Sequence, residues 1–207
     1  MHLTGYHRFD RTAAQVAWVA VLALFTATPS LADDPTTIAT TVCAACHGPD
    51  GNSLAPNFPK LAGQQQSYLE KQLNEFLSGK RKNDIMAAIL PNISKDSVPA
   101  LAAHFAAQKP APGAVADAAL VEAGKKIYED GNTATGLPAC QGCHLPKGEG
   151  NERFPRLAGQ HQTYVLQELA DFKNGVRTND KGKIMRAVAE RMSEQEMKAV
   201  SEYIAGL

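Results

Sequence analysis

Cys43-Ala44-Ala45-Cys46-His47 is one of two Cys-X-X-Cys-His stretches in this chain, and Cys140-Gln141-Gly142-Cys143-His144 is the other. Together they contain all 4 cysteines of the 207 residues. Two thiols one helical turn apart can each add to a vinyl group of one porphyrin, and the histidine that follows supplies an imidazole to the iron, so the pattern is typical of covalently attached haem c. The duplication predicts two haem c groups, one bonded through Cys43 and Cys46 and one through Cys140 and Cys143.

A Cys-X-X-Cys pair also suits a zinc site, a redox disulfide or the disulfide framework of a secreted protein. A zinc site built from both pairs usually has them within about 15–20 residues of each other, whereas residues 47–139 separate the two pairs here. A thioredoxin-like site would lie in a βαβ pattern, and the sequence has no such pattern. Because a histidine directly follows each pair, we favour haem over these alternatives.

The first 32 residues resemble an export signal. Arg8 and Arg11 precede an apolar stretch over residues 13–27, and Ser30-Leu31-Ala32 offers small residues for cleavage. The stretch is short against the roughly 20 apolar residues that a membrane-spanning helix needs, so we favour a cleaved signal peptide over an uncleaved anchor. We therefore expect a periplasmic protein, either free or resting against the membrane, whose mature chain starts at Asp33.

The charges of the chain are balanced, with 21 Lys and Arg against 21 Asp and Glu. Proteins that bind nucleic acid usually carry a basic patch or stripe, and no such stripe is visible in this sequence. We therefore expect no nucleic acid as a partner.

The second half of the chain repeats the first. Residues 58–64 (FPKLAGQ) match residues 154–160 (FPRLAGQ), and the match continues without a gap to Asn83-Asp84 and Asn179-Asp180. A repeat of this length predicts two homologous domains in tandem. We expect a signal peptide over 1–32, an N-terminal domain over 33–109, a linker over 110–116 and a C-terminal domain over 117–207. The linker contains Pro110 and Pro112, which stop a helix, and it is short, so we expect the domains to touch and the haems to exchange electrons.

Within each copy the apolar residues follow a helical period, so we predict an all-α fold. Residues 65–78 and 162–174 each present one apolar stripe and stop before a glycine. Ser193 and Glu196 predict a capping box for the last helix, and its counterpart should begin near Ser94 or Ser97. Helices are also expected over 35–46 and 117–128. Domains this small have little core of their own, and a buried porphyrin would complete it.

The iron bound by His47 or by His144 needs a ligand on its opposite face. A methionine thioether favours ferrous iron and raises the reduction potential. After the signal segment the first copy contains a single methionine, Met86, and the repeat aligns it with Met185 after a three-residue insertion in the second copy. The matched positions predict Met86 and Met185 as the axial ligands.

Other candidates for this position lack a matched partner. Met192 and Met197 align with aliphatic residues of the first copy, which predicts that they fill the core. His104 aligns with a tyrosine and His161 with a glutamine, so we predict structural or surface positions for both histidines.

Neighbouring residues are expected to support the ligands. A haem histidine normally donates its other ring N–H to an acceptor, and a backbone carbonyl near Pro59 or Pro155 is the expected one. Four polar residues just before the methionines could hold that loop, contact haem propionates or simply be exposed: Arg81, Asn83, Arg177 and Asn179.

With both Cys-X-X-Cys-His motifs, both Phe-Pro-X-Leu-Ala-Gly segments and both Asn-Asp…Met segments, the chain resembles a dihaem cytochrome c of the cytochrome c4 family. The resemblance covers nearly all of the chain after residue 32. It implies two all-α class I cytochrome c domains related by pseudo-twofold symmetry, with His47 and Met86 on one iron and His144 and Met185 on the other. It also implies electron transfer in the periplasm toward a terminal oxidase or reductase, which can be membrane-bound.

The opening of the first domain departs from this pattern, because residues 38–42 do not repeat Gly124-Lys125-Lys126-Ile127-Tyr128. We expect a weaker contact between the first and last helices there and unequal haem potentials. One alternative is a dihaem cytochrome subunit of a larger oxidoreductase, such as flavocytochrome c sulfide dehydrogenase. A dihaem peroxidase is less favoured, because two methionines would close both irons. We therefore expect an electron carrier and not an enzyme, with redox proteins as partners and no small-molecule substrate.

Overall fold

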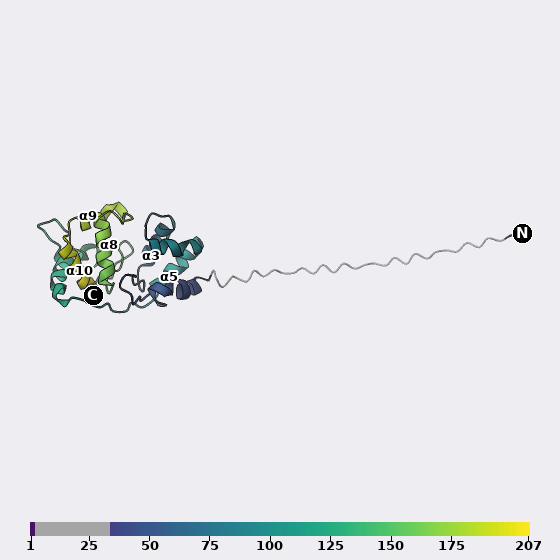
Figure 1. Cartoon of the computed structure of the whole chain (residues 1–207), viewed down its shortest axis with the longest axis horizontal. Helices are drawn as coiled ribbons and strands as arrows, with labels where there is room; N and C mark the ends of the chain where they lie inside the picture. The colour runs from purple at the N-terminus through teal and green to yellow at the C-terminus, as the bar shows by residue number, and fades with distance from the viewer. Residues whose placement is uncertain (3–33) are drawn as a thin grey trace.

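The computed structural model describes residues 1–2 and 34–207. Apart from residues 1 and 2, the predicted signal segment lies outside the described residues. Two groups of helices lie side by side, one containing α3 and α5 and the other α8, α9 and α10 (Figure 1). Among the described residues the pairing of extended backbone is limited to an isolated bridge between Asn132 and Leu137. The predicted all-α fold is confirmed, and no described helix is long and apolar enough to cross a membrane.

The N-terminal domain opens with a continuous helical run that ends in the first haem motif. This run consists of α1 (Pro35–Ile38), the π-helical segment η2 (Ala39–Cys43) and α2 (Ala44–His47). The remaining elements are α3 (Gln66–Leu77), α4 (Asp84–Ile89), η3 (Leu90–Asn92), η4 (Lys95–Ser97) and α5 (Val98–Ala106). The periodicity predicts a helix over 35–46 but not its π-helical turn, a feature that is rare in proteins.

The C-terminal domain has the same plan with a separate first helix. Its elements are η5 (Ala118–Leu120), α6 (Val121–Asp130), α7 (Gln141–His144), α8 (Gln162–Lys173), η6 (Lys181–Lys183), α9 (Ile184–Glu190) and α10 (Glu194–Gly206). In this domain a loop over residues 131–139 separates the first helix from the haem motif.

The helix ends follow the expected signals. α3 and α8 stop just before Gly79 and Gly175, which have φ angles of 72° and 69°, a region that glycine adopts without strain. α10 begins with the predicted capping box between Ser193 and Glu196. α5 starts after Ser97 and holds Pro99 in its first turn, where proline is tolerated.

Each domain has its own hydrophobic core. In the N-terminal domain α1 and α5 share a cluster that includes Ile38, Leu101 and Phe105. In the C-terminal domain Tyr128 of α6 packs with residues of α8 and α10. Met192 and Met197 are each 2% exposed and belong to this second cluster, so their prediction as core residues is confirmed.

The first and last helices meet more extensively in the C-terminal domain, between α6 and α10, than in the N-terminal domain. Gly124 makes this close approach possible, because a Cβ atom there would lie 2.0 Å from the carbonyl oxygen of Ala199. In the N-terminal domain the short α1 and the segment η2 take the place of α6. The difference that the sequence predicts between the two openings is therefore present in the structure.

The segment that joins the domains is attached to both. Lys60 Nζ donates to the carbonyl oxygen of Pro112 at 2.8 Å, and the amide of Ala111 donates to Asn52 Oδ1 at 2.7 Å. On the other side, the amide of Ala116 donates to Glu202 Oε2 at 2.8 Å. These contacts fix the connecting segment against the two helical groups.

Two equivalent glutamines join the domains through paired hydrogen bonds. Gln64 accepts from the amide of Arg156 at 2.8 Å and donates to its carbonyl at 2.9 Å. Gln160 makes the same pair of bonds with the backbone of Lys60, at 2.9 Å each. The repeat aligns Gln64 with Gln160 and Lys60 with Arg156, so the contacts obey a pseudo-twofold axis. The expectation that the domains touch is confirmed.

Candidate haem sites

The first haem motif lies at the end of the opening helical run. Cys43 and Cys46 form no disulfide, and Cys43 packs against the N-terminal core. His47 is 8% exposed, and its Nδ1 lies 2.9 Å from the carbonyl oxygen of Pro59. The ring therefore donates its proton there, which fixes the tautomer and leaves the lone pair of Nε2 available to a metal.

The second motif has the same geometry on α7. Cys140 packs against the C-terminal core, and neither Cys140 nor Cys143 forms a disulfide. His144 is 6% exposed, and its Nδ1 donates to the carbonyl oxygen of Pro155 at 2.9 Å. The expectation that carbonyls at these two prolines fix the histidine rings is confirmed. The shared Phe-Pro pairs thus do more than shape a turn, because each presents an acceptor to the histidine of its own domain.

Burial keeps the histidines of both motifs uncharged. It lowers the pKa of His47 and of His144, and the hydrogen bond to each proline carbonyl opposes this only in part. The imidazoles are therefore neutral, the form that binds a metal.

The two matched methionines lie in the corresponding helices. Met86 is on α4, where its amide donates to Asn83 Oδ1 at 3.0 Å, and Met185 is on α9. Met86 packs against the same core cluster as Cys43, and Met185 packs against the cluster of Cys140. Each domain thus brings one methionine and one haem motif together around its own core.

His104 and His161 occupy structural positions, as predicted. His161 lies between the domains, with its Nε2 at 2.9 Å from both the hydroxyl and the carbonyl oxygen of Ser53. His104 packs edge-on against the ring of Phe105, with 5.0 Å between the ring centroids.

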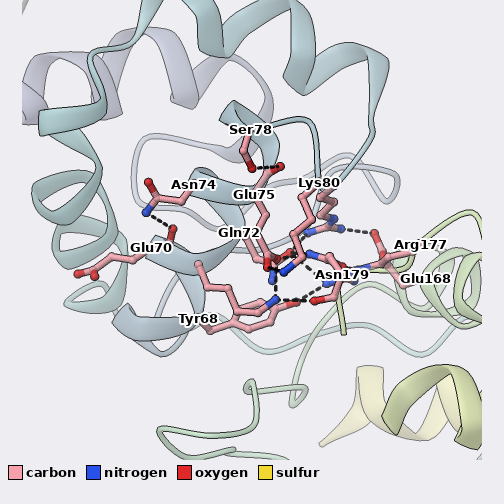
Figure 2. A network of polar contacts seen from close by, with 12 residues as sticks. Tyr68, Glu70, Gln72, Asn74, Glu75, Ser78, Lys80, Glu168, Arg177 and Asn179 are labelled. Carbon is pink, nitrogen blue, oxygen red and sulfur yellow. Dashed lines mark hydrogen bonds and ion pairs between the residues drawn. The ribbon is translucent and has the colours of Figure 1, made fainter. Parts of the chain in front are cut away.

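A polar cluster in the domain interface, the arginine cluster, was not predicted from the sequence. It consists of Tyr68, Gln72, Arg81, Tyr164, Glu168 and Arg177. Arg81 and Arg177 both bind the carboxylate of Glu168, and Figure 2 shows the part around Arg177 and Gln72. Both guanidinium groups also cover an aromatic ring of their own domain, Phe76 at 4.6 Å and Phe172 at 4.5 Å.

A signal for this cluster was present in the repeat. Tyr68 aligns with Tyr164, Gln72 with Glu168 and Arg81 with Arg177. Polar residues that recur at helical spacing suggest a shared polar face, but the sequence does not reveal that the two faces meet. The side chains of Arg81 and Arg177 are only 10% and 9% exposed, so the option of an exposed role for these two residues is wrong.

The residues fit a haem group in each domain. Each domain supplies two cysteines that form no disulfide, a neutral histidine with a fixed ring and a methionine on the same core. In addition, Arg156 Nε and Gln72 Nε2 are buried and find no acceptor among the described residues. Buried donors normally have partners, and the carboxylates of haem propionates are acceptors of the required kind.

Comparison with known proteins agrees with this arrangement. The chain matches the family "Cytochrome c" over residues 33–107 and 121–207. It is 51% identical over 178 residues to cytochrome c4 of Azotobacter vinelandii, covering 80% of this chain and 84% of that protein. It is 38% identical over 170 residues to a thiosulfate dehydrogenase electron acceptor of Stutzerimonas stutzeri, covering 80% of this chain and 78% of that one.

A solved structure shows the same fold. The crystal structure of reduced recombinant cytochrome c4 from Pseudomonas stutzeri superimposes with a TM-score of 0.80 at 44% identity, covering 85% of this chain and 98% of that chain. Each segment that matches the family contains one Cys-X-X-Cys-His motif, and the chain carries two covalently attached haem c groups. The chain therefore belongs to the cytochrome c4 family of dihaem electron-transfer proteins.

Proposed function

We propose that this protein is a periplasmic electron carrier and not an enzyme. It passes single electrons between respiratory redox proteins, toward a terminal oxidase or reductase. Each bound haem c supplies one Fe(III)/Fe(II) couple. The observation that carries the proposal is the matched pair of sites. In each domain the haem motif, with its histidine, and one methionine lie around the same hydrophobic core.

We assign the ligands as follows. Cys43 and Cys46 attach one haem, and Cys140 and Cys143 attach the other. The axial ligands of the irons are His47 with Met86 and His144 with Met185. The carbonyl oxygens of Pro59 and Pro155 hold the imidazoles in the tautomer that presents Nε2.

Two ligands on each iron would leave no position for a substrate. The histidines are buried and the methionines are partly buried against the same cores, which limits the access of water to the iron. This suits rapid electron exchange and disfavours peroxidase chemistry, which needs an open iron face. We also propose that residues 33–109 and 117–207 are the two domains and that 110–116 links them, so that their direct contact supports electron exchange inside the molecule.

The similarity to a thiosulfate dehydrogenase electron acceptor favours one class of donor. We propose that an oxidoreductase acting on a sulfur compound can reduce this protein. Thiosulfate dehydrogenase with thiosulfate should then reduce both haems in stopped-flow mixing. A carrier that serves other donors would stay oxidised in this mixture and would be reduced only by another respiratory complex.

The carrier role is tested by a redox titration combined with peroxide mixing. The full holoprotein should titrate as two one-electron couples, and its reduced form should react with hydrogen peroxide no faster than a mitochondrial-type cytochrome c does. A high-spin haem at rest, or rapid oxidation by peroxide with turnover, would contradict the proposal. Export is tested separately by the mass of the periplasmic protein, which should start at Asp33 and include two haem groups.

A further inference from the structure

The two methionine segments are held in different ways although the sequence repeats around them. Asn83 and Asn179 are equivalent residues, each followed by an aspartate. Asn83 is exposed, and its side chain caps α4 locally by accepting from the amide of Met86. Asn179 is 2% exposed and reaches instead into the other domain.

Asn179 is bound by α3 of the N-terminal domain (Figure 2). Its Nδ2 donates to Gln72 Oε1 at 3.0 Å and to Glu75 Oε2 at 2.6 Å. Its backbone carbonyl accepts from Lys71 Nζ at 2.8 Å. The remaining side-chain acceptor, Oδ1, receives a hydrogen bond from Arg177 Nε at 2.9 Å. Both polar groups of this side chain are therefore used. With the backbone carbonyl included, Asn179 makes four hydrogen bonds, and the partners in three of them lie on α3.

A short connection leads from Asn179 to Met185. The next residue, Asp180, has a side chain that is 4% exposed and pairs with Arg186 Nε at 2.7 Å. The same carboxylate accepts from the backbone amide of Arg186 at 3.1 Å. Arg186 directly follows Met185, so the start of α9 is fixed through Asp180 to the residue that α3 holds.

The first domain lacks this connection. Ala87 stands where the second domain has Arg186, so Asp84 has no such ion pair available. The three-residue insertion of the second domain includes Gly182 and Lys183 in the left-handed region, and the N-cap residue of α9, Lys183, makes no capping hydrogen bond with its side chain. The segment of Met185 therefore depends on the anchor at Asn179 and Asp180.

We propose that α3 of the N-terminal domain positions Met185 on the iron of the C-terminal domain, acting through Asn179 as a positioning residue. The contact strengthens the methionine ligation of the second haem, whereas the equivalent asparagine beside Met86, Asn83, binds within its own domain. The proposal rests on the ligand assignment given above. It makes the domain interface part of the second haem site.

The test measures how readily imidazole displaces methionine from ferric iron in the full holoprotein. A Met86→Ala protein reports only Met185 through its Met–Fe(III) charge-transfer absorption, and a Met185→Ala protein reports only Met86. Adding Asn179→Ala should lower the imidazole concentration at half-displacement about tenfold in the first protein, an effect of the size of one buried hydrogen bond. The same substitution should leave the second protein unchanged.

Two lysines supply a matched pair of milder variants. Lys71 and Lys80 both pair with Glu75, at 2.6 and 2.8 Å, but of the two only Lys71 touches Asn179. Both side chains are partly exposed, so Lys71→Met and Lys80→Met should fold even if Asn179→Ala does not. Lys71→Met should weaken Met185 ligation across the interface, and Lys80→Met should not.

The outcomes distinguish a wrong positioning role for Asn179 from a wrong assignment of Met185 as ligand. Equal shifts at both haems, equal shifts from both lysine variants, or no shift from Asn179→Ala and Lys71→Met would overturn the positioning role. If the Met86→Ala protein shows no charge-transfer absorption while Asn179 is intact, the assignment of Met185 itself is wrong. A shift confined to Met185, larger for Asn179→Ala than for Lys71→Met, supports the proposal.

Discussion

Glu168 and Gln72 occupy equivalent positions in the two domains, and both meet Arg81 and Arg177 at the centre of the interface. Arg81 lies 2.6 Å from Glu168 Oε1 and 2.7 Å from Gln72 Oε1. A perfect repeat would place two carboxylates or two amides side by side there. The Gln and Glu pair avoids repulsion between two carboxylates and still gives both arginines one counter-charge.

Removing that counter-charge should destabilise the contact between the domains. Glu168→Gln leaves two buried guanidinium groups without a carboxylate, and we expect a loss of about 3 kcal/mol, the lower end for a buried pair that loses one partner. The measurement is denaturant unfolding of the holoprotein. Glu152→Gln, at an exposed residue, is the control and should change the free energy of unfolding by less than about 0.5 kcal/mol. Equal effects would contradict this view of the interface.

The same carboxylate predicts an acid-sensitive interface. Burial opposes ionisation of Glu168, yet Arg177 and Arg81 outweigh it and hold its pKa below the ordinary 4.5. A carboxyl with a lowered folded pKa stabilises the fold above its unfolded pKa, and this contribution is lost as the pH falls through the folded pKa. Stability should therefore drop below about pH 4.5. The free energy of unfolding of Glu168→Gln should fall less steeply over that range. If it falls with pH in parallel with that of the unmodified protein, Glu168 is not the cause of the acid sensitivity.

His161 predicts a second pH effect at higher values. Burial lowers its pKa below the ordinary 6.5, while its hydrogen bond to Ser53 opposes the shift. Because the folded state holds the neutral ring, stability should decline as the pH falls below 6.5 toward the folded pKa. His161→Gln introduces the residue found at the equivalent position, Gln65. Its stability should change less as the pH falls below 6.5, as measured by thermal unfolding in matched buffers. If the variant loses stability with falling pH as the unmodified protein does, His161 is not the cause of this pH effect.

The crossing of α6 and α10 should tolerate no side chain at Gly124. Gly124→Ala places a methyl group 2.0 Å from the carbonyl oxygen of Ala199, so the helices must separate, and we expect a loss of about 1–3 kcal/mol. Gly142→Ala is the matched control, because a Cβ there meets nothing within 4 Å and the first haem motif has Ala45 at this position. A thermal shift as large for Gly142→Ala as for Gly124→Ala would contradict the packing argument.

Local signals in the sequence predict much of this fold, because they act over a few residues. Gly79 and Gly175 end helices through their backbone freedom, and Ser193 with Glu196 starts one through its cap. The contacts of Asn83 and Asn179 could not be predicted from such local signals. The same residue in the same local sequence caps a helix in one domain and crosses the interface in the other, because the insertion at 181–183 and the facing α3 decide its partners.

The candidate site also has a part that the sequence predicts and a part that it does not. The motifs predict which residues gather around each core, and the repeat singles out one methionine per domain. The arginine cluster depends on how the two domains pack, which involves residues about a hundred positions apart. No local period in the sequence contains that information.

The most direct test of the central claim, that each iron is held by a histidine and a methionine of its own domain, is the Met–Fe(III) charge-transfer absorption per haem. Met86→Ala and Met185→Ala should each remove about half of the intensity of the unmodified protein, since each would lose one of two such ligands. Met192→Leu and Met197→Leu, which alter core methionines with little change in volume, should keep the full intensity. Full intensity in either alanine variant, or its loss in a leucine variant, would contradict the account.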